Sequence, residues 1–277
     1  RQGMEYSEFV DLNKLGAVVT KGVANVPWPG NPTPRIAETY GGMINAIGLQ
    51  NPGIDVFCER DIPFLKKYDT KIIVNVCGKS ERDYVEVVER LAGEPVDMLE
   101  INISCPNVKE GGIAFGQNAA NIEHITKAIK NVAKQPVIMK LSPNVTDITE
   151  MAKAAEAGGA DVLSLINTIT GMKIDINRQT FAVANKTGGL SGPAVKPVAV
   201  RMVYQVANAV KIPIIGMGGI ATAEDALEFI LAGATAVSIG TANFHNPRTT
   251  LEVIEGIEKY MVNKGVSDIN DLIGIVK

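Results

Sequence analysis

The chain has 277 residues, a net charge of −3 and 46% hydrophobic residues, so it can bury one large core, and we expect a single domain over residues 1–277. Its basic residues are scattered, which argues against nucleic acid as a partner, and no apolar run approaches the roughly 20 residues that span a bilayer. Three cysteines at irregular spacings and only two histidines argue against a disulfide framework and a metal site. We therefore expect a cytoplasmic protein that acts on a small molecule.

Short β-branched runs alternate with amphipathic helical patterns along the chain, which is typical of a parallel sheet with helical crossovers. The sequence predicts seven strands, at residues 17–20, 71–76, 98–104, 136–141, 162–167, 213–216 and 236–240. Amphipathic stretches that predict helices lie at residues 81–91, 120–134, 148–157, 195–210, 223–231 and 249–262.

Seven strands are one short of a (β/α)8 TIM barrel, and the first predicted element is a helix at residues 6–15. We therefore expect an N-terminally truncated barrel whose first strand lies in a segment of roughly 20 to 30 residues before Arg1. The alternative is a doubly wound open sheet. Two long connections, 25–55 and 171–192, are expected to project over the face where barrel enzymes place their active sites.

Glycine-bearing turns follow the last two predicted strands, at residues 216–220 (GMGGI) and 240–242 (GTA). In barrels the loops after strands 7 and 8 form a phosphate site, where backbone N–H groups approach the anion. The two turns together predict a phosphorylated ligand. The alternative interpretation is that these glycines only permit tight turns.

Cys105 follows the fourth predicted strand and lies between Asn102 and Asn107. A cysteine just beyond the carboxyl end of a strand, with amide neighbours and a proline that ends the strand pairing, is placed for chemistry more than for packing. Cys58 fits a helical face and Cys77 ends a strand without comparable polar neighbours, so we expect both to be buried packing residues.

Amide and lysine side chains gather at the predicted strand ends. Several asparagines together offer the donors and acceptors that match the edge of a pyrimidine or an isoalloxazine ring. A lysine beside the N1 and C2 carbonyl of a flavin would stabilise the negative charge that reduction places there. The polar residues at these strand ends are Lys21, Asn45, Asn75, Asn102, Asn107, Lys140, Asn167 and Thr168.

At these residues the sequence resembles the soluble, cysteine-containing dihydroorotate dehydrogenases. The resemblance implies FMN-dependent oxidation of (S)-dihydroorotate to orotate in de novo pyrimidine biosynthesis, with the C5 proton taken by Cys105 and the C6 hydride by flavin N5. Because a free thiol has a pKa near 8.5, activity is expected to rise on the alkaline side. The motifs are 20–22 (TKG), 30–35 (GNPTPR), 45–51 (NAIGLQN), 102–107 (NISCPN), 166–168 (INT), 188–192 (GGLSG) and both glycine turns.

The same resemblance implies the binding residues, with Lys21 meeting both flavin and substrate. The FMN contacts that it implies are Lys21, Gly22, Asn75, Asn102, Lys140, Ile166, Gly192, Gly218, Gly219, Gly240 and Thr241. The substrate contacts that it implies are Lys21, Asn45, Ala46, Ile47, Gly48, Leu49, Asn102, Asn107, Asn167 and Thr168.

The stretches 45–53 and 109–116 are similar to the catalytic subunit of the NAD-linked type 1B enzymes. That resemblance implies a homodimer core with an electron-transfer subunit that carries FAD and a 2Fe-2S cluster, together a heterotetramer that passes electrons to NAD. This chain has too few cysteines to hold such a cluster itself. The alternatives are a fumarate-linked type 1A homodimer and another FMN-dependent pyrimidine oxidoreductase, such as a dihydropyrimidine dehydrogenase.

Two other classes of function compete with this interpretation. A phosphate-binding barrel isomerase or lyase would have no redox role and would use Lys140 as a Schiff-base residue. A non-enzymatic binding module fits least, because the polar groups concentrate on one predicted face. The absorption of bound flavin in the purified protein would separate the dehydrogenase from the lyase.

Overall fold

The fold is built on one parallel sheet, seen in a computed structural model that describes residues 3–103 and 116–276. Its strand order, β1-β4-β5-β6-β7-β12-β13, follows the sequence without reversal, which rules out the doubly wound alternative. All seven predicted strands are present. Their bounds are β1 (Ala17–Val19), β4 (Lys71–Val76), β5 (Met98–Asn102), β6 (Val137–Lys140), β7 (Val162–Leu165), β12 (Ile214–Met217) and β13 (Ala236–Ser238).

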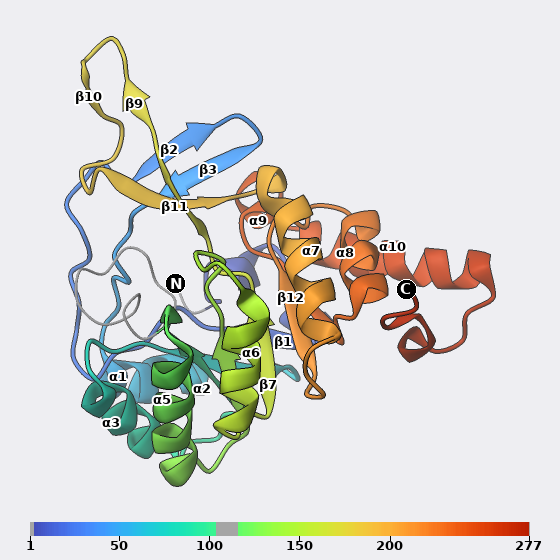
Figure 1. Ribbon diagram of the computed structural model, residues 1–277, viewed down its shortest axis with the longest axis horizontal. Helices are drawn as coiled ribbons and strands as arrows, with labels where there is room; N and C mark the ends of the chain where they lie inside the picture. Colours follow the sequence, from blue (N-terminus) through green and yellow to red (C-terminus); the bar gives the residue numbers. More distant parts are fainter. Residues whose placement is uncertain (1–2, 104–115, 277) are drawn as a thin grey trace.

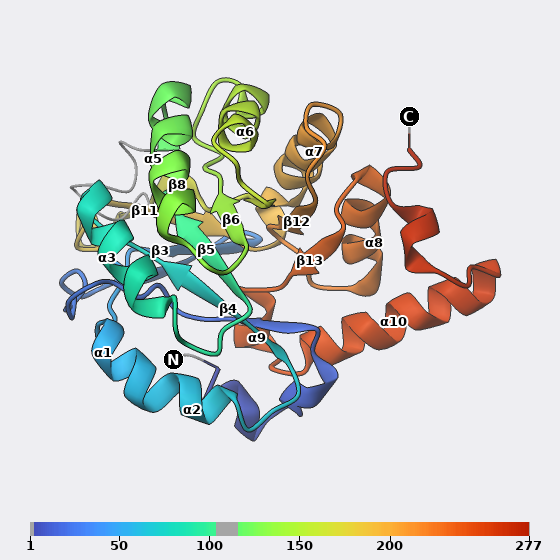
Figure 2. The ribbon, with the colours of Figure 1, turned by 90° about the horizontal axis from the view of Figure 1, so that it is seen from below.

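The helices form an arc around one face of the curved sheet (Figure 2). Neighbouring helices pack side by side in chain order, from α3 to α8, and α10 packs on α8. A sequential parallel sheet wrapped by helices on its outer face is the (β/α) barrel architecture, with β1 and β13 as the edge strands. The helices are α3 (Glu81–Leu91), α5 (Ala119–Val132), α6 (Ile148–Ala157), α7 (Lys196–Ala207), α8 (Ala223–Ala232), α9 (Ala242–His245) and α10 (Thr249–Lys264).

The prediction of one continuous helix over residues 6–15 is wrong. The segment folds into two short 3-10 helices, η1 (Tyr6–Glu8) and η2 (Leu12–Lys14). Asp11 adopts an extended conformation between them, and its side chain accepts a hydrogen bond from the backbone N–H of Asn13, so it starts a new turn instead of continuing the first. Residues 54–65 form a further helical segment: α1 (Ile54–Val56), the π-helical η3 (Phe57–Asp61) and α2 (Ile62–Leu65).

The two long connections pair with each other. They form a second, antiparallel sheet of four strands in the order β2-β3-β11-β8, from which the β9–β10 hairpin projects (Figure 1). In this sheet Gly189 lies opposite Asn45, and a Cβ at Gly189 would lie 2.0 Å from Oγ1 of Thr168. The strands are β2 (Ile36–Thr39), β3 (Gly42–Asn45), β8 (Ile169–Met172), β9 (Ile174–Asp175), β10 (Thr180–Phe181) and β11 (Thr187–Ser191).

The main core lies between the parallel sheet and its helices, and it also supports the end of β5. Tyr84 of α3 is fully buried there, and its hydroxyl donates a hydrogen bond of 2.8 Å to the carbonyl oxygen of Asn102. A buried phenol needs such a partner, so this contact fixes the position where β5 ends.

Of the helices within the described ranges, none has the length and apolar character to cross a membrane.

Candidate active site

Polar side chains from four adjacent strands meet at the carboxyl ends of the parallel sheet. Asn75 lies on β4, Glu100 and Asn102 on β5, Lys140 on β6 and Ser164 on β7. The strand register places Asn75 beside Glu100, and Lys140 beside both Asn102 and Ser164. Because alternate residues of a strand share a face, Glu100 and Asn102 project from the same side of β5. All but Lys140 are buried.

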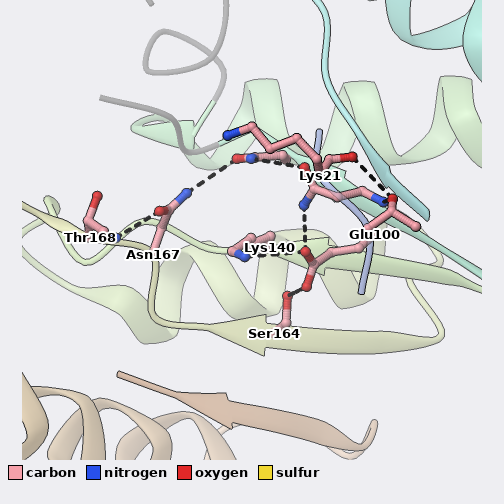
Figure 3. A network of polar contacts seen from close by, with 9 residues as sticks. Lys21, Glu100, Lys140, Ser164, Asn167 and Thr168 are labelled. Atoms are coloured by element: carbon pink, nitrogen blue, oxygen red, sulfur yellow. Dashed lines mark hydrogen bonds and ion pairs between the residues drawn. The ribbon is translucent and has the colours of Figure 1, made fainter. Parts of the chain in front are cut away.

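Glu100 joins these strands through both oxygens of its carboxylate. Its Oε1 accepts hydrogen bonds from Nδ2 of Asn75 at 2.5 Å and from Nζ of Lys140 at 3.2 Å. Its Oε2 accepts a hydrogen bond of 2.8 Å from the Ser164 hydroxyl. Only 1% of Glu100 is exposed, so these three donors replace the water that a buried carboxylate would otherwise require (Figure 3).

Sequence reasoning missed Glu100. The available signal was a single acidic residue inside the apolar run of β5, two positions before Asn102 and therefore on the same face of the strand. An acidic residue in a strand that is buried on both sides is unusual unless it is paired.

Three asparagine side chains form a row that continues from Glu100, which we call the amide row: Asn75, Asn102 and Asn167. Nδ2 of Asn102 donates to Oδ1 of Asn75 at 3.2 Å, and Nδ2 of Asn167 donates to Oδ1 of Asn102 at 3.3 Å. The row ends where Oδ1 of Asn167 accepts a hydrogen bond of 2.8 Å from the backbone N–H of Thr168 (Figure 3). The structure thus brings together five of the residues predicted at strand ends: Asn75, Asn102, Lys140, Asn167 and Thr168.

A cavity of about 310 Å³ adjoins this network at the carboxyl ends of β6, β7, β12 and β13. Both predicted phosphate turns line it, although they are separated in sequence. Thr241, in the second turn, donates a hydrogen bond of 2.8 Å to the hydroxyl of Ser191. The predicted site residues that line the cavity are Lys140, Ile166, Asn167, Thr168, Gly192, Gly218, Gly219, Gly240 and Thr241.

Gly219 and Gly240 lie in different surroundings, so glycine is explained differently at the two positions. Gly219 has a φ of +83°, and a Cβ there would lie 2.8 Å from the Gly192 carbonyl oxygen and 2.9 Å from the Lys196 nitrogen, so the fold itself requires glycine. At Gly240 a Cβ would meet nothing within 4 Å. The packing of the chain does not explain Gly240, whereas a ligand that approaches the bare backbone would. This open space and the nearby hydroxyls fit a phosphate group.

The first turn is held in place by ion pairs between two helices. Nζ of Lys196, at the start of α7, donates to Oδ1 of Asp225 at 2.6 Å and also to Glu228. Burial opposes ionisation of Asp225, but hydrogen bonds from Lys196 and from the backbone N–H groups of Ala221 and Thr222 outweigh it and lower the pKa of Asp225. These contacts anchor the loop that follows Gly219.

Lys21 and Gly22 lie beside the first asparagine of the amide row. The Thr20 hydroxyl donates to the carbonyl oxygen of Lys21 at 3.1 Å and accepts from the backbone N–H of Asn75, also at 3.1 Å. A Cβ at Gly22 would lie 3.1 Å from Oδ1 of Asn75. Lys21 and Ile47 line a second cavity of about 400 Å³, distinct from the one that the phosphate turns line.

The predicted substrate segment 45–49 is supported by the preceding loop. Nδ2 of Asn31 donates to the carbonyl oxygen of Ala46 at 3.1 Å, and the backbone N–H of Asn31 donates to that of Ile47 at 3.0 Å. Gly48 and Leu49 both have positive φ angles, 73° and 53°. None of the predicted substrate residues Asn45, Ala46, Ile47, Gly48 and Leu49 lines the 310 Å³ cavity.

Two of the three cysteines are buried, and the third, Cys105, lies outside the described residues. Cys58 and Cys77 are both buried, as predicted. Burial, reinforced by the nearby Glu94 carboxylate, raises the pKa of Cys58 to about 11, so its thiol stays protonated at neutral pH. Cys105 and Asn107 lie outside the described residues, and their assigned roles stay predictions.

The matching family profile and the similar proteins point to one enzyme family. The family profile described as "Dihydroorotate dehydrogenase" matches residues 1–261. A protein of Lachnoclostridium phytofermentans named "Dihydroorotate dehydrogenase B (NAD(+)), catalytic subunit" is 77% identical over 275 residues, which are 99% of this chain and 92% of that protein. Proteins with the same name from Alkaliphilus oremlandii (66% over 272 residues, 98% and 90%) and Thermoanaerobacter pseudethanolicus (56% over 275 residues, 99% and 91%) are also similar.

Proposed function

This chain belongs to the dihydroorotate dehydrogenase family, and we propose that it is the catalytic subunit of an NAD-linked enzyme that oxidises (S)-dihydroorotate to orotate in pyrimidine biosynthesis. One observation supports the proposal most directly. The amide row and Lys140 adjoin a cavity that both phosphate turns line. A flat, hydrogen-bonding ring that carries a phosphate fits this combination of donors, acceptors and bare backbone.

FMN is the cofactor that suits the cavity, and when bound it supplies a ring that accepts a hydride and passes electrons on. The Lys140 ammonium would stabilise the negative charge that the ring gains on reduction. The bare backbone at Gly240 would receive the phosphate. The residues proposed to hold FMN are Lys21, Gly22, Asn75, Asn102, Lys140, Ile166, Gly192, Gly218, Gly219, Gly240 and Thr241.

The substrate ring would lie against the asparagines at the ends of β5 and β7. We propose that Cys105, which follows Asn102 by three positions, takes the C5 proton. A thiolate performs this step, so the surroundings of Cys105 would have to favour ionisation, unlike those of Cys58. The residues proposed to hold the substrate are Lys21, Asn45, Ala46, Ile47, Gly48, Leu49, Asn102, Asn107, Asn167 and Thr168.

The names of the relatives support a second subunit, since each is called a catalytic subunit and NAD(+)-linked. We propose that this chain forms a homodimer core that pairs with an electron-transfer subunit carrying FAD and a 2Fe-2S cluster, and that the complex works in the cytoplasm. The shared NAD(+) name favours this arrangement over the fumarate-linked homodimer.

Anaerobic titration of the purified protein with dihydroorotate tests the proposal. The expected result is a flavin spectrum that bleaches on addition of dihydroorotate in the wild type and in Cys58→Ala, but at least about 100-fold more slowly in Cys105→Ala. Cys58→Ala is the matched control, because it removes a thiol that burial keeps protonated. Colourless protein that releases no FMN on denaturation would contradict the proposal. Co-expression with the partner subunit should make the reduction of NAD depend on dihydroorotate.

A further inference from the structure

The amide row has a direction, because every asparagine in it donates toward Glu100 and accepts from the Thr168 side. We propose that Glu100 is a positioning residue whose carboxylate fixes this direction and thereby the pattern of donors and acceptors that the site presents to the substrate ring. The inference rests on the proposed function, since it concerns residues assigned there to flavin and substrate. Glu100 itself is 1% exposed and acts through Asn75.

One end of the row lies at Glu100. The three neighbours of its carboxylate, the Lys140 ammonium, the Ser164 hydroxyl and the Asn75 amide, all donate to it. An ionised carboxylate can only accept, so Asn75 must present Nδ2 to Glu100 and Oδ1 to Asn102. The contacts from Lys140 and Ser164 reach both oxygens and hold the carboxylate in place.

The other end of the row lies at Thr168. The backbone N–H of Thr168 can only donate, so Asn167 must present Oδ1 to it and Nδ2 to Asn102. Asn102 then donates to Asn75 and accepts from Asn167. An acceptor at one end and a donor at the other thus impose the same sense on all three amides.

Shape alone would not impose this direction, because the oxygen and nitrogen of an asparagine amide are nearly equal in size. Turning one amide around would place two N–H₂ groups or two oxygens against each other within a buried network. Such a mismatch leaves buried polar groups unsatisfied. The hydrogen bond to the carboxylate is charge-assisted and therefore stronger than the amide–amide bonds that it directs.

The direction matters for recognition. A dihydropyrimidine-dione ring alternates C=O and N–H groups along its edge, so a site that reverses one amide offers a donor where the ring needs an acceptor. Asn102 and Asn167 belong both to the amide row and to the residues proposed to hold the substrate. Glu100 therefore determines the polarity of the substrate site from a position that the substrate does not reach.

Two substitutions of similar size separate the acceptor from its charge. Glu100→Gln and Glu100→Met both remove the negative charge beside Lys140, but only glutamine keeps an oxygen that can accept from Asn75. We would titrate orotate into each FMN-loaded protein, follow the flavin absorbance, and record FMN content and unfolding temperature on the same samples. We expect Glu100→Gln to bind orotate within about threefold of the wild type and Glu100→Met at least about tenfold more weakly than Glu100→Gln, which corresponds to about 1.4 kcal/mol.

Equal orotate affinities in the two variants, with matched FMN content and unfolding temperature, would overturn the proposal. If Glu100→Met does not fold or loses FMN, Glu100→Asp replaces it, because aspartate keeps the charge but withdraws the carboxylate by about 1.5 Å, beyond reach of Asn75. Weaker orotate binding by Glu100→Asp than by Glu100→Gln supports the proposal, and the opposite order contradicts it. Wild-type protein that binds neither FMN nor orotate would instead contradict the proposed function.

Discussion

The ammonium of Lys140 lies 3.2 Å from the carboxylate of Glu100 on the neighbouring strand, and side-chain exposure falls from 16% for the lysine to 1% for the glutamate. The pair is neutral as a whole, so a ring placed beside Lys140 meets less positive charge than a lone lysine would provide. Glu100 is the buried member of the pair. Removing Glu100 and removing Lys140 should therefore have different consequences.

Removing the negative charge should raise the reduction potential of the bound flavin. In Glu100→Gln the Lys140 ammonium loses its counter-ion and stabilises the reduced ring more strongly. We expect the midpoint potential to rise by about 30 mV, which corresponds to about 1.4 kcal/mol for a two-electron couple. Equilibration with a reference dye during anaerobic reduction measures it. An unchanged or lower potential would show that the charge of the pair does not reach the flavin.

Removing the positive charge should destabilise the protein, because it leaves the buried Glu100 carboxylate with the neutral donors Asn75 and Ser164. We expect Lys140→Met to lower the free energy of unfolding by about 3 kcal/mol. The double variant Lys140→Met, Glu100→Gln should recover part of this loss, since it buries no charge. Urea unfolding of the FMN-free proteins measures both values. A double variant that is less stable than Lys140→Met alone would contradict the explanation.

Alanine at Gly219 should weaken folding, whereas alanine at Gly240 should weaken FMN binding. Gly219→Ala meets backbone atoms at 2.8 and 2.9 Å in a left-handed conformation, so we expect a loss of about 2 kcal/mol in folding stability. Gly240→Ala meets open space, so the FMN-free protein should unfold at the wild-type temperature while FMN binding weakens at least about tenfold. Thermal unfolding and FMN titration test each protein. Normal FMN affinity in Gly240→Ala would remove that turn from the phosphate site.

Cys58 should make stability depend on alkaline pH. Its folded pKa, about 11, lies above the 9.0 of an unburied thiol, so the folded state holds the proton more tightly than the unfolded chain. The resulting stabilisation, at most about 2 kcal/mol, is complete below pH 9 and is lost as the pH rises toward 11. Unfolding free energies measured across this range should fall more steeply in the wild type than in Cys58→Ala. Parallel curves would contradict the assignment.

The parallel strands could be predicted because most of them are buried on both sides and form continuous apolar runs. β4, with the sequence KIIVNV and five buried residues, is the clearest case. The antiparallel sheet could not be predicted in the same way. β11 has the sequence TGGLS, which has little strand propensity, and it becomes a strand because β3 and β8 lie on either side of it.

Within the candidate site, the sequence identified residues by type and by position at strand ends, which is sufficient for Asn75, Asn102 and Asn167. It did not identify Glu100, because the importance of a buried charge depends on neighbours from other strands, and Lys140 is 40 residues away in the chain. Cys105 was predicted from its neighbours in sequence and awaits the tests described above.

The antiparallel sheet also has a mechanical consequence. β3 leads directly into segment 45–49, and β11 leads directly into Gly192, which lines the 310 Å³ cavity. These two strands are hydrogen-bonded to each other. A displacement of β11 is therefore transmitted through β3 to segment 45–49. Binding of the cofactor should stiffen the substrate segment in advance and lower the entropy that the substrate must give up. The two ligands are thus expected to bind cooperatively.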